Sequence, residues 1–198
     1  MISKTKATIA GLVLTALVPG AAVGQFSESY NFLKAVRDRD GTKATEIITK
    51  PGSVIIDTRE QASGEAAIHI VTKRRDMTWI GFLLSRGARP DVRDGQGNTA
   101  LNLAAQIGFT EGATQLLKFR ASVDLANNSG ETPLIRAVQA RDIAMARLLL
   151  LAGANPAKTD RVAGMSARDY AARDERAKTI LALIDSAKPA KAAAGPKP

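Results

Sequence analysis

Paired aliphatic residues recur along the chain at a nearly constant distance. The pairs are separated by 33, 33 and 34 residues, and they are Leu83–Leu84, Leu116–Leu117, Leu149–Leu150 and Leu183–Ile184. An alanine-containing apolar stretch lies upstream of each pair, as at 101–105 and 134–138, and a polar turn separates the two. Two apolar segments joined by a polar turn and repeated at this period predict stacked helix-turn-helix units.

Glycines mark the same period at the start of each unit. Gly64, Gly97, Gly130 and Gly164 are also 33, 33 and 34 residues apart. Hydroxyl side chains follow two residues later at Thr99, Thr132 and Ser166, where each can cap the first helix, whereas Ala66 has no hydroxyl. After the second helix, Gly87 and Gly153 can adopt the left-handed conformation that ends a helix, and Arg120 occupies the equivalent position without that advantage.

The phrases Gly-Glu-Thr-Pro-Leu-Ile-Arg-Ala at 130–137 and Leu-Leu-Leu-Leu-Ala-Gly-Ala-Asn-Pro at 148–156 resemble the ankyrin-repeat family. The resemblance covers about residues 28–186. It implies an all-α solenoid of stacked helix-turn-helix units with short hairpin-like tips. The units fall at about 61–93, 94–126 and 127–160, with a C-terminal cap at 161–186.

The residues before 61 form an irregular leading unit, which we interpret as an N-terminal cap over 28–60. Phe32, Val36 and Ile47 match Ile68, Thr72 and Leu83 at a constant offset of 36 residues, which predicts three extra residues within 50–61. A single unit cannot bury its apolar face, but stacked units share one core. The sequence therefore predicts one repeat domain over 25–186.

The N-terminus has the pattern of a secretory signal peptide over 1–24. Lys4 and Lys6 precede an uncharged apolar stretch at 7–18, and Ala22 and Gly24 are small residues suited to cleavage before Gln25. Cleavage after Ala22 stays open. Twelve apolar residues span only about 18 Å as a helix, against a hydrocarbon core of about 30 Å, so the mature chain is expected to lack a transmembrane anchor. We interpret the chain as an exported, bacterial-type ankyrin-repeat protein, located in the periplasm or secreted.

Composition adds limits on the chemistry. The chain has no cysteine and a single histidine, which excludes disulfides and thiol catalysis. The segment 187–198 combines lysine, alanine, glycine and proline, and it is predicted to be a disordered tail. The net charge is +9, and without the two lysines of the leader and the three of the tail it is +4 for residues 25–187.

The basic residues of the repeats suggest a surface strip. Aligning the units places one row at the end of the first helices: Arg37, Lys73, Gln106, Gln139 and Arg173. A second row follows two residues later: Arg39, Arg75, Gly108, Arg141 and Glu175. These side chains could form a basic recognition strip. We favour the simpler interpretation, in which cations complement helix C-termini on a solvated face.

Catalytic, metal and cofactor sites are not expected. His69 occupies the place of the histidine in the family's Thr-Pro-Leu-His phrase, and the resemblance implies that it forms hydrogen bonds between neighbouring tips. No nucleophile-elbow phrase, calcium-loop spacing or phosphate-binding glycine loop occurs. Aromatic residues are too sparse for a nucleic-acid stacking platform, so no nucleic-acid partner is expected.

The resemblance implies a non-catalytic module that binds a protein or peptide on the concave face formed by the tips and the first helices, and an acidic partner is one option. The predicted contacts are Gln61, Ser63, Glu65, Lys73, Arg74, Arg75, Asp94, Gln96, Asn98, Gln106, Asn128, Ser129, Glu131, Gln139 and Arg141. An alternative is attachment to an anionic envelope polymer or lipid surface through the basic strip and the lysine-rich tail. The two hypotheses differ in salt dependence, because binding through exposed charges weakens as ionic strength rises.

Overall fold

The computed structural model describes residues 20–187, and the side chains from residue 28 onward. The predicted leader up to residue 19 and the predicted tail from residue 188 therefore lie outside the described residues. Helices and loops make up the described chain; the β-type pairing found within it is limited to two isolated bridges, Arg59 with Ala66 and Thr159 with Ser166.

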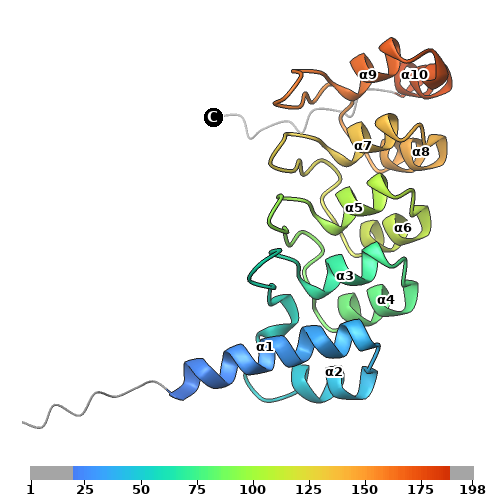
Figure 1. The fold of residues 1–198 in the computed structure, drawn as a ribbon. Helices are drawn as coiled ribbons and strands as arrows, with labels where there is room; N and C mark the ends of the chain where they lie inside the picture. Colours follow the sequence, from blue (N-terminus) through green and yellow to red (C-terminus); the bar gives the residue numbers. More distant parts are fainter. Residues whose placement is uncertain (1–19, 188–198) are drawn as a thin grey trace, which may run out of the picture.

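The helices form two layers that are stacked unit by unit (Figure 1). The first-layer helices are α1 (Gly20–Asp38), α3 (Ala67–Lys73), α5 (Ala100–Gln106), α7 (Pro133–Gln139) and α9 (Ala167–Arg173). The second-layer helices are α2 (Gly41–Ile48), α4 (Met77–Ser85), α6 (Thr110–Lys118), α8 (Ile143–Leu151) and α10 (Lys178–Ser186). Short hairpin loops project from the side of the stack in front of α3, α5, α7 and α9. The predicted all-α solenoid of stacked helix pairs is confirmed.

Capping residues fix where the first-layer helices begin. The hydroxyls of Thr99, Thr132 and Ser166 accept from the amides of Asn102, Ile135 and Asp169, as the sequence predicts. Ala66 provides no such bond at the start of α3. Three of the second-layer helices, α2, α4 and α8, use aspartate instead: the side chains of Asp40, Asp76 and Asp142 accept from amides in the first turn.

The core lies between the two layers and runs continuously through the units. Leu83, Leu116 and Leu149 are each fully buried, as the repeated pairs predict. In the two middle pairs the second member is less protected, and Leu117 and Leu150 are only half-buried. The order is reversed in the last pair, where Ile184 is buried and Leu183 is half-buried. Neighbouring residues on a helix point about 100° apart, so one member enters the shared core while the other faces its edge.

The leading unit differs from the repeats at both of its ends. The extra residues before the first hairpin loop contain a 3₁₀ turn, η1 (Ile55–Asp57), whose Ile55 is buried in the core. Helix α1 has 19 residues, whereas α3 has 7. It begins at Gly20, ahead of the boundary predicted at residue 28, and it runs beneath the first hairpin loop (Figure 1).

The last unit contains a second 3₁₀ turn, η2 (Glu175–Ala177). Within the described residues, no helix is both long and apolar enough to cross a bilayer.

Candidate functional site

Four hairpin loops, here called fingers 1 to 4, form one side of the candidate binding face. Finger 1 is 60–65, finger 2 is 94–98, finger 3 is 127–131 and finger 4 is 160–165. A carboxylate or amide oxygen at the first position closes three of the turns. Asp94 Oδ1 accepts from Gln96 and Asn98 at 2.9 and 2.8 Å. Equivalent oxygens of Asn127 and Asp160 accept from amides of their own fingers.

Finger 4 contains a buried carboxylate that is held in its charged form. Burial alone would raise the pKa of Asp160, but the Tyr170 hydroxyl donates to Oδ2 at 2.5 Å and three finger amides donate to Oδ1. These donors stabilise the carboxylate, so the pKa of Asp160 lies below its ordinary value. Tyr170 in α9 thereby fixes finger 4 against the last unit.

Backbone hydrogen bonds join each finger to the one before it. The amides of Gly95, Asn128 and Arg161 donate to the carbonyls of Ser63, Gln96 and Ser129 at 2.9, 3.0 and 2.8 Å. The fingers are packed so closely that a Cβ atom at Gly64 would lie only 2.5 Å from the nitrogen of Gly95. The row of fingers is therefore a continuous, hydrogen-bonded edge.

His69 connects α3 to the following finger, and it is fully buried. Its Nδ1 accepts from the Ala66 amide at 3.0 Å, so the proton resides on Nε2. Nε2 then donates to the carbonyls of Val92 and Asn98, at 3.0 and 3.1 Å. Burial lowers the pKa of His69 below its ordinary value, against smaller opposing contributions from the Asp94 and Glu65 carboxylates. The bridging role that the family resemblance implies is confirmed.

Asn102 makes the same connection one unit later. Its Oδ1 accepts from the Thr99 amide at 2.9 Å, and its Nδ2 donates to the carbonyls of Leu125 and Glu131 at 3.1 and 3.3 Å. The two carbonyls lie 23 and 29 residues after Asn102, as Val92 and Asn98 do after His69. A histidine and an asparagine thus serve one structural purpose, which explains His69 without any catalytic role.

The predicted contact residues divide into exposed and internally used side chains. Those exposed to solvent are Gln61, Lys73, Arg75, Gln96, Gln106, Asn128, Gln139 and Arg141; those half-buried are Ser63, Glu65, Arg74, Asp94, Ser129 and Glu131. Asn98 is a correction, because its side chain is only 2% exposed. It donates to Asp94 and accepts from Asn127, so it stabilises fingers 2 and 3 from inside and does not present a contact surface.

The cations of the proposed basic strip are engaged within the chain. Arg74 donates to the carbonyl of Val36 at 2.5 Å, and its guanidinium also lies over the Trp79 ring. Arg75 donates to the carbonyl of Ile107 in the next unit. Arg141 pairs with Asp174 at 2.6 Å, again one unit further on. Lys73 pairs with Glu65 of finger 1.

The second row of this strip also has an unusual backbone. Arg39, Arg75 and Arg141 have φ angles of 60°, 58° and 55°, and Gly108 at the same position has 62°. The left-handed conformation turns the chain between the two helices of a unit. It is strained for any residue other than glycine. Together with the pairing, this geometry gives Arg75 and Arg141 a structural role that was not predicted: they join neighbouring units.

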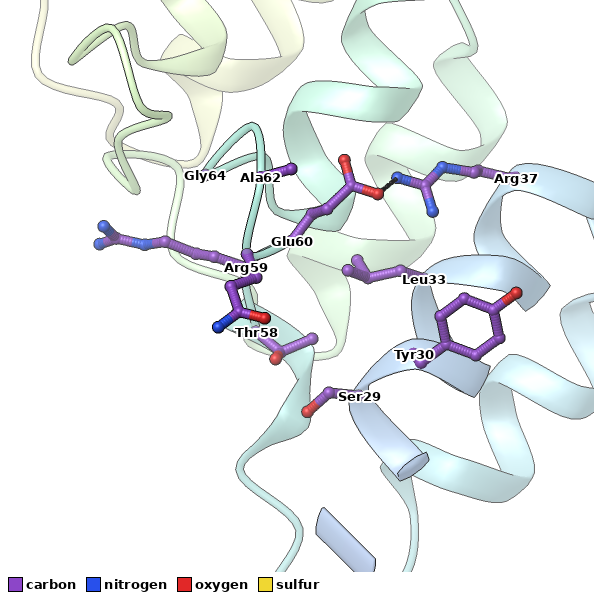
Figure 2. Close-up of a pocket in the computed structure, with 10 residues that line it drawn as sticks. Ser29, Tyr30, Leu33, Arg37, Thr58, Arg59, Glu60, Ala62 and Gly64 are labelled. Carbon is purple, nitrogen blue, oxygen red and sulfur yellow. Dashed lines mark hydrogen bonds and ion pairs between the residues drawn. The ribbon is translucent and has the colours of Figure 1, made fainter. Parts of the chain in front are cut away.

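A pocket at the N-terminal end of the fingers was not predicted. It encloses about 660 Å³ between α1 and finger 1. Its lining consists of Ser29, Tyr30, Leu33 and Arg37 from α1, and of residues 58–62 and Gly64 on the other side (Figure 2). Of the predicted contacts only Gln61 lines it. The available signal was Glu28, which lies four residues before Phe32, where the repeats have the glycine of a finger, as Gly64 lies four residues before Ile68.

Among the residues that the structure describes, no three histidine, cysteine, aspartate or glutamate side chains are grouped as a metal site would require. What the candidate site offers is a row of fingers, exposed polar side chains on the first-layer helices and one pocket. This arrangement can bind an extended surface.

Residues 68–160 match a family model described as ankyrin repeats in three copies. Over 97 residues the chain is 37% identical to the B-cell lymphoma 3 protein homolog of Mus musculus, covering 46% of this chain and 22% of that protein. Over 113 residues it is 34% identical to a putative ankyrin repeat-containing protein of Treponema pallidum (strain Nichols), covering 57% and 38%. It is also 29% identical over 109 residues to protein phosphatase 1 regulatory subunit 27 of Mus musculus, covering 55% and 70%. The matched region is thus well under half of each of the first two relatives.

Proposed function

We propose that this chain, whose residues 68–160 match the ankyrin-repeat family model, is a non-catalytic interaction module that binds a protein or peptide on the face formed by its fingers and first-layer helices. Fold alone does not assign a function, so the proposal depends on what this face presents.

One observation carries the proposal: each unit places an exposed polar side chain at the same position near the end of its first-layer helix. The row consists of Arg37, Lys73, Gln106, Gln139 and Arg173. The fingers beside these helices are joined to one another by backbone hydrogen bonds, so they form a rigid edge next to this row of side chains. A repeated, rigid face of this kind can bind an elongated partner with little ordering cost.

The internal pairing of the cations favours a partner recognised through polar contacts over one recognised mainly by negative charge. Lys73, Arg75 and Arg141 already have acceptors within the chain, whereas Gln106 and Gln139 are exposed amides that can both donate and accept. Attachment to an anionic polymer or lipid would use these same cations together with the lysine-rich tail, which lies outside the described residues, and it is less well supported.

Site-specific photocrosslinking tests the binding face. A photoreactive amino acid at Gln106 or Gln139 should crosslink to a specific partner, whereas the same group at Lys118, exposed on α6, should not. If the Lys118 derivative gives the same products in the same yield, the face is not the binding surface.

The proposed compartment is the periplasm or the exterior of the cell. Its support is the leader pattern: two lysines, a short apolar stretch and small residues before Gln25. The partner should therefore be sought among envelope or secreted proteins, and nucleic acid is not an expected partner.

A further inference from the structure

Finger 1 is the open end of the finger row. Fingers 2, 3 and 4 each donate an amide from their second residue to the finger before them. The equivalent residue of finger 1 is Gln61, and within residues 20–187 its amide has no hydrogen-bond acceptor. No finger precedes it, because the long α1 runs through that place (Figure 1).

The 660 Å³ pocket lies between α1 and finger 1, on the side of finger 1 where the other fingers contact a preceding finger. Tyr30 stands on its α1 side with 63% of its surface exposed, and Leu33 lies beside it, largely buried (Figure 2). Thr58 and Ala62 belong to the opposite wall. An exposed aromatic ring beside an aliphatic floor is suited to bind an apolar side chain.

Charge on the finger side of the pocket is positive. Arg37 and Glu60 form an ion pair at 2.6 Å across the rim, so they neutralise each other. Arg59 is exposed and has no ion pair among the described residues. Figure 2 shows its side chain directed away from Tyr30, at the other edge of the pocket. A carboxylate bound there would be attracted to an unneutralised guanidinium.

We propose that this pocket binds an extended peptide segment of a partner protein, which continues the finger row by one position. A backbone carbonyl of the peptide accepts from the Gln61 amide. An apolar side chain packs against Tyr30 and Leu33, and the carboxylate of an adjacent acidic residue pairs with Arg59. Successive side chains of an extended peptide point to opposite sides, as Tyr30 and Arg59 do in this pocket. The inference rests on the proposed function and adds a second, chemically defined subsite to it.

The test uses the full chain, labelled with ¹⁵N, and the synthetic peptide acetyl-Gly-Leu-Asp-Gly-amide. Titration should shift the amide resonances of Gln61 and Ala62, with a dissociation constant on the order of 1 mM for so short a ligand. Replacing leucine by serine, or aspartate by asparagine, in the peptide should weaken binding. The absence of shifts at Gln61 and Ala62 at peptide concentrations well above the expected dissociation constant would overturn the proposal.

Substitutions of Tyr30 and Arg59 test the two side-chain contacts without disturbing the core, since both residues are exposed. Tyr30→Ser and Arg59→Glu should each raise the dissociation constant by about fivefold or more, while Phe119→Ser and Arg147→Glu, exposed elsewhere, should leave it unchanged. Equal affinity in all four variants would refute the subsite. Shifts at Gln61 that depend on protein concentration without peptide would instead assign the pocket to a second copy of the chain. Crosslinking from Gln106 and Gln139 does not involve this pocket, so failure here is distinguishable from failure of the proposed function.

Discussion

The Nε2 atom of His69 lies 3.1 Å from the carbonyl oxygen of Asn98, and this hydrogen bond joins a first-layer helix to the finger of the next repeat. The connection recurs between Asn102 and Glu131. It stops at the third repeat, where the apolar Ile135 occupies the equivalent position. This side-chain link from a first-layer helix to the next finger is therefore made by the first two repeats, at His69 and Asn102, and not by Ile135 of the third.

Removing the imidazole of His69 should destabilise the fold. His69→Ala leaves the amide of Ala66 and two buried carbonyls without their partner, so the free energy of unfolding should fall by about 2 to 4 kcal/mol. His69→Asn should be milder, because asparagine makes this connection at Asn102. Urea denaturation would measure both, and equal losses for the two variants would contradict the bridging role.

Stability should depend on pH through His69. Its folded-state pKa lies below the ordinary value of 6.5, so the unfolded chain takes up the proton first as pH falls. Stability is therefore complete above about pH 6.5 and declines below it, by at most about 1.4 kcal/mol for each pH unit. Between about pH 7 and 5 most carboxylates stay ionised. The loss in this interval should be clearly smaller in His69→Asn, and identical profiles for the two proteins would contradict the assignment.

The two members of an aliphatic pair should differ in their cost of truncation. Leu116→Ala opens a cavity in the shared core and should cost about 2 to 5 kcal/mol. Leu117 is half-buried, so Leu117→Ala should cost about half of that or less. Denaturant midpoints compare them directly. A larger loss for Leu117→Ala would mean that the core faces the other side of α6.

Reversing the charge of Arg141 should weaken the contact between the last two units. Arg141→Glu replaces an ion pair with Asp174 by two facing carboxylates, but both groups are partly exposed, so the cost should be about 1 kcal/mol or less. It should shrink as salt is added. Arg147→Glu, exposed on α8, is the matched control. Equal midpoints for the two variants at low salt would show that the pair contributes nothing.

The leader predicts where the mature chain begins. N-terminal sequencing of the exported protein should return Gln25, or Val23 if cleavage follows Ala22. Either cut removes only the beginning of α1 and leaves Tyr30 and Phe32 in place. Recovery of an intact Met1 from the cytoplasm would contradict export.

Periodicity alone determined most of the fold. The spacing of the glycines and aliphatic pairs predicted the helix pairs, the caps at Thr99, Thr132 and Ser166, and the burial of Leu83, Leu116 and Leu149. These features are local or repeat from unit to unit, so a one-dimensional pattern contains them. The family resemblance added the bridging histidine.

Only the tertiary structure decided which polar side chains remain free. Asn98 and Gln96 are two residues apart in one finger, yet the first is buried between fingers and the second is exposed. Arg141 reaches an acceptor 33 residues away, and Gln106 stays exposed at the end of its helix. The pocket beside Tyr30 exists because α1 continues where a finger would otherwise stand. Each outcome depends on contacts between units, and sequence spacing does not specify which neighbour satisfies a given donor or charge.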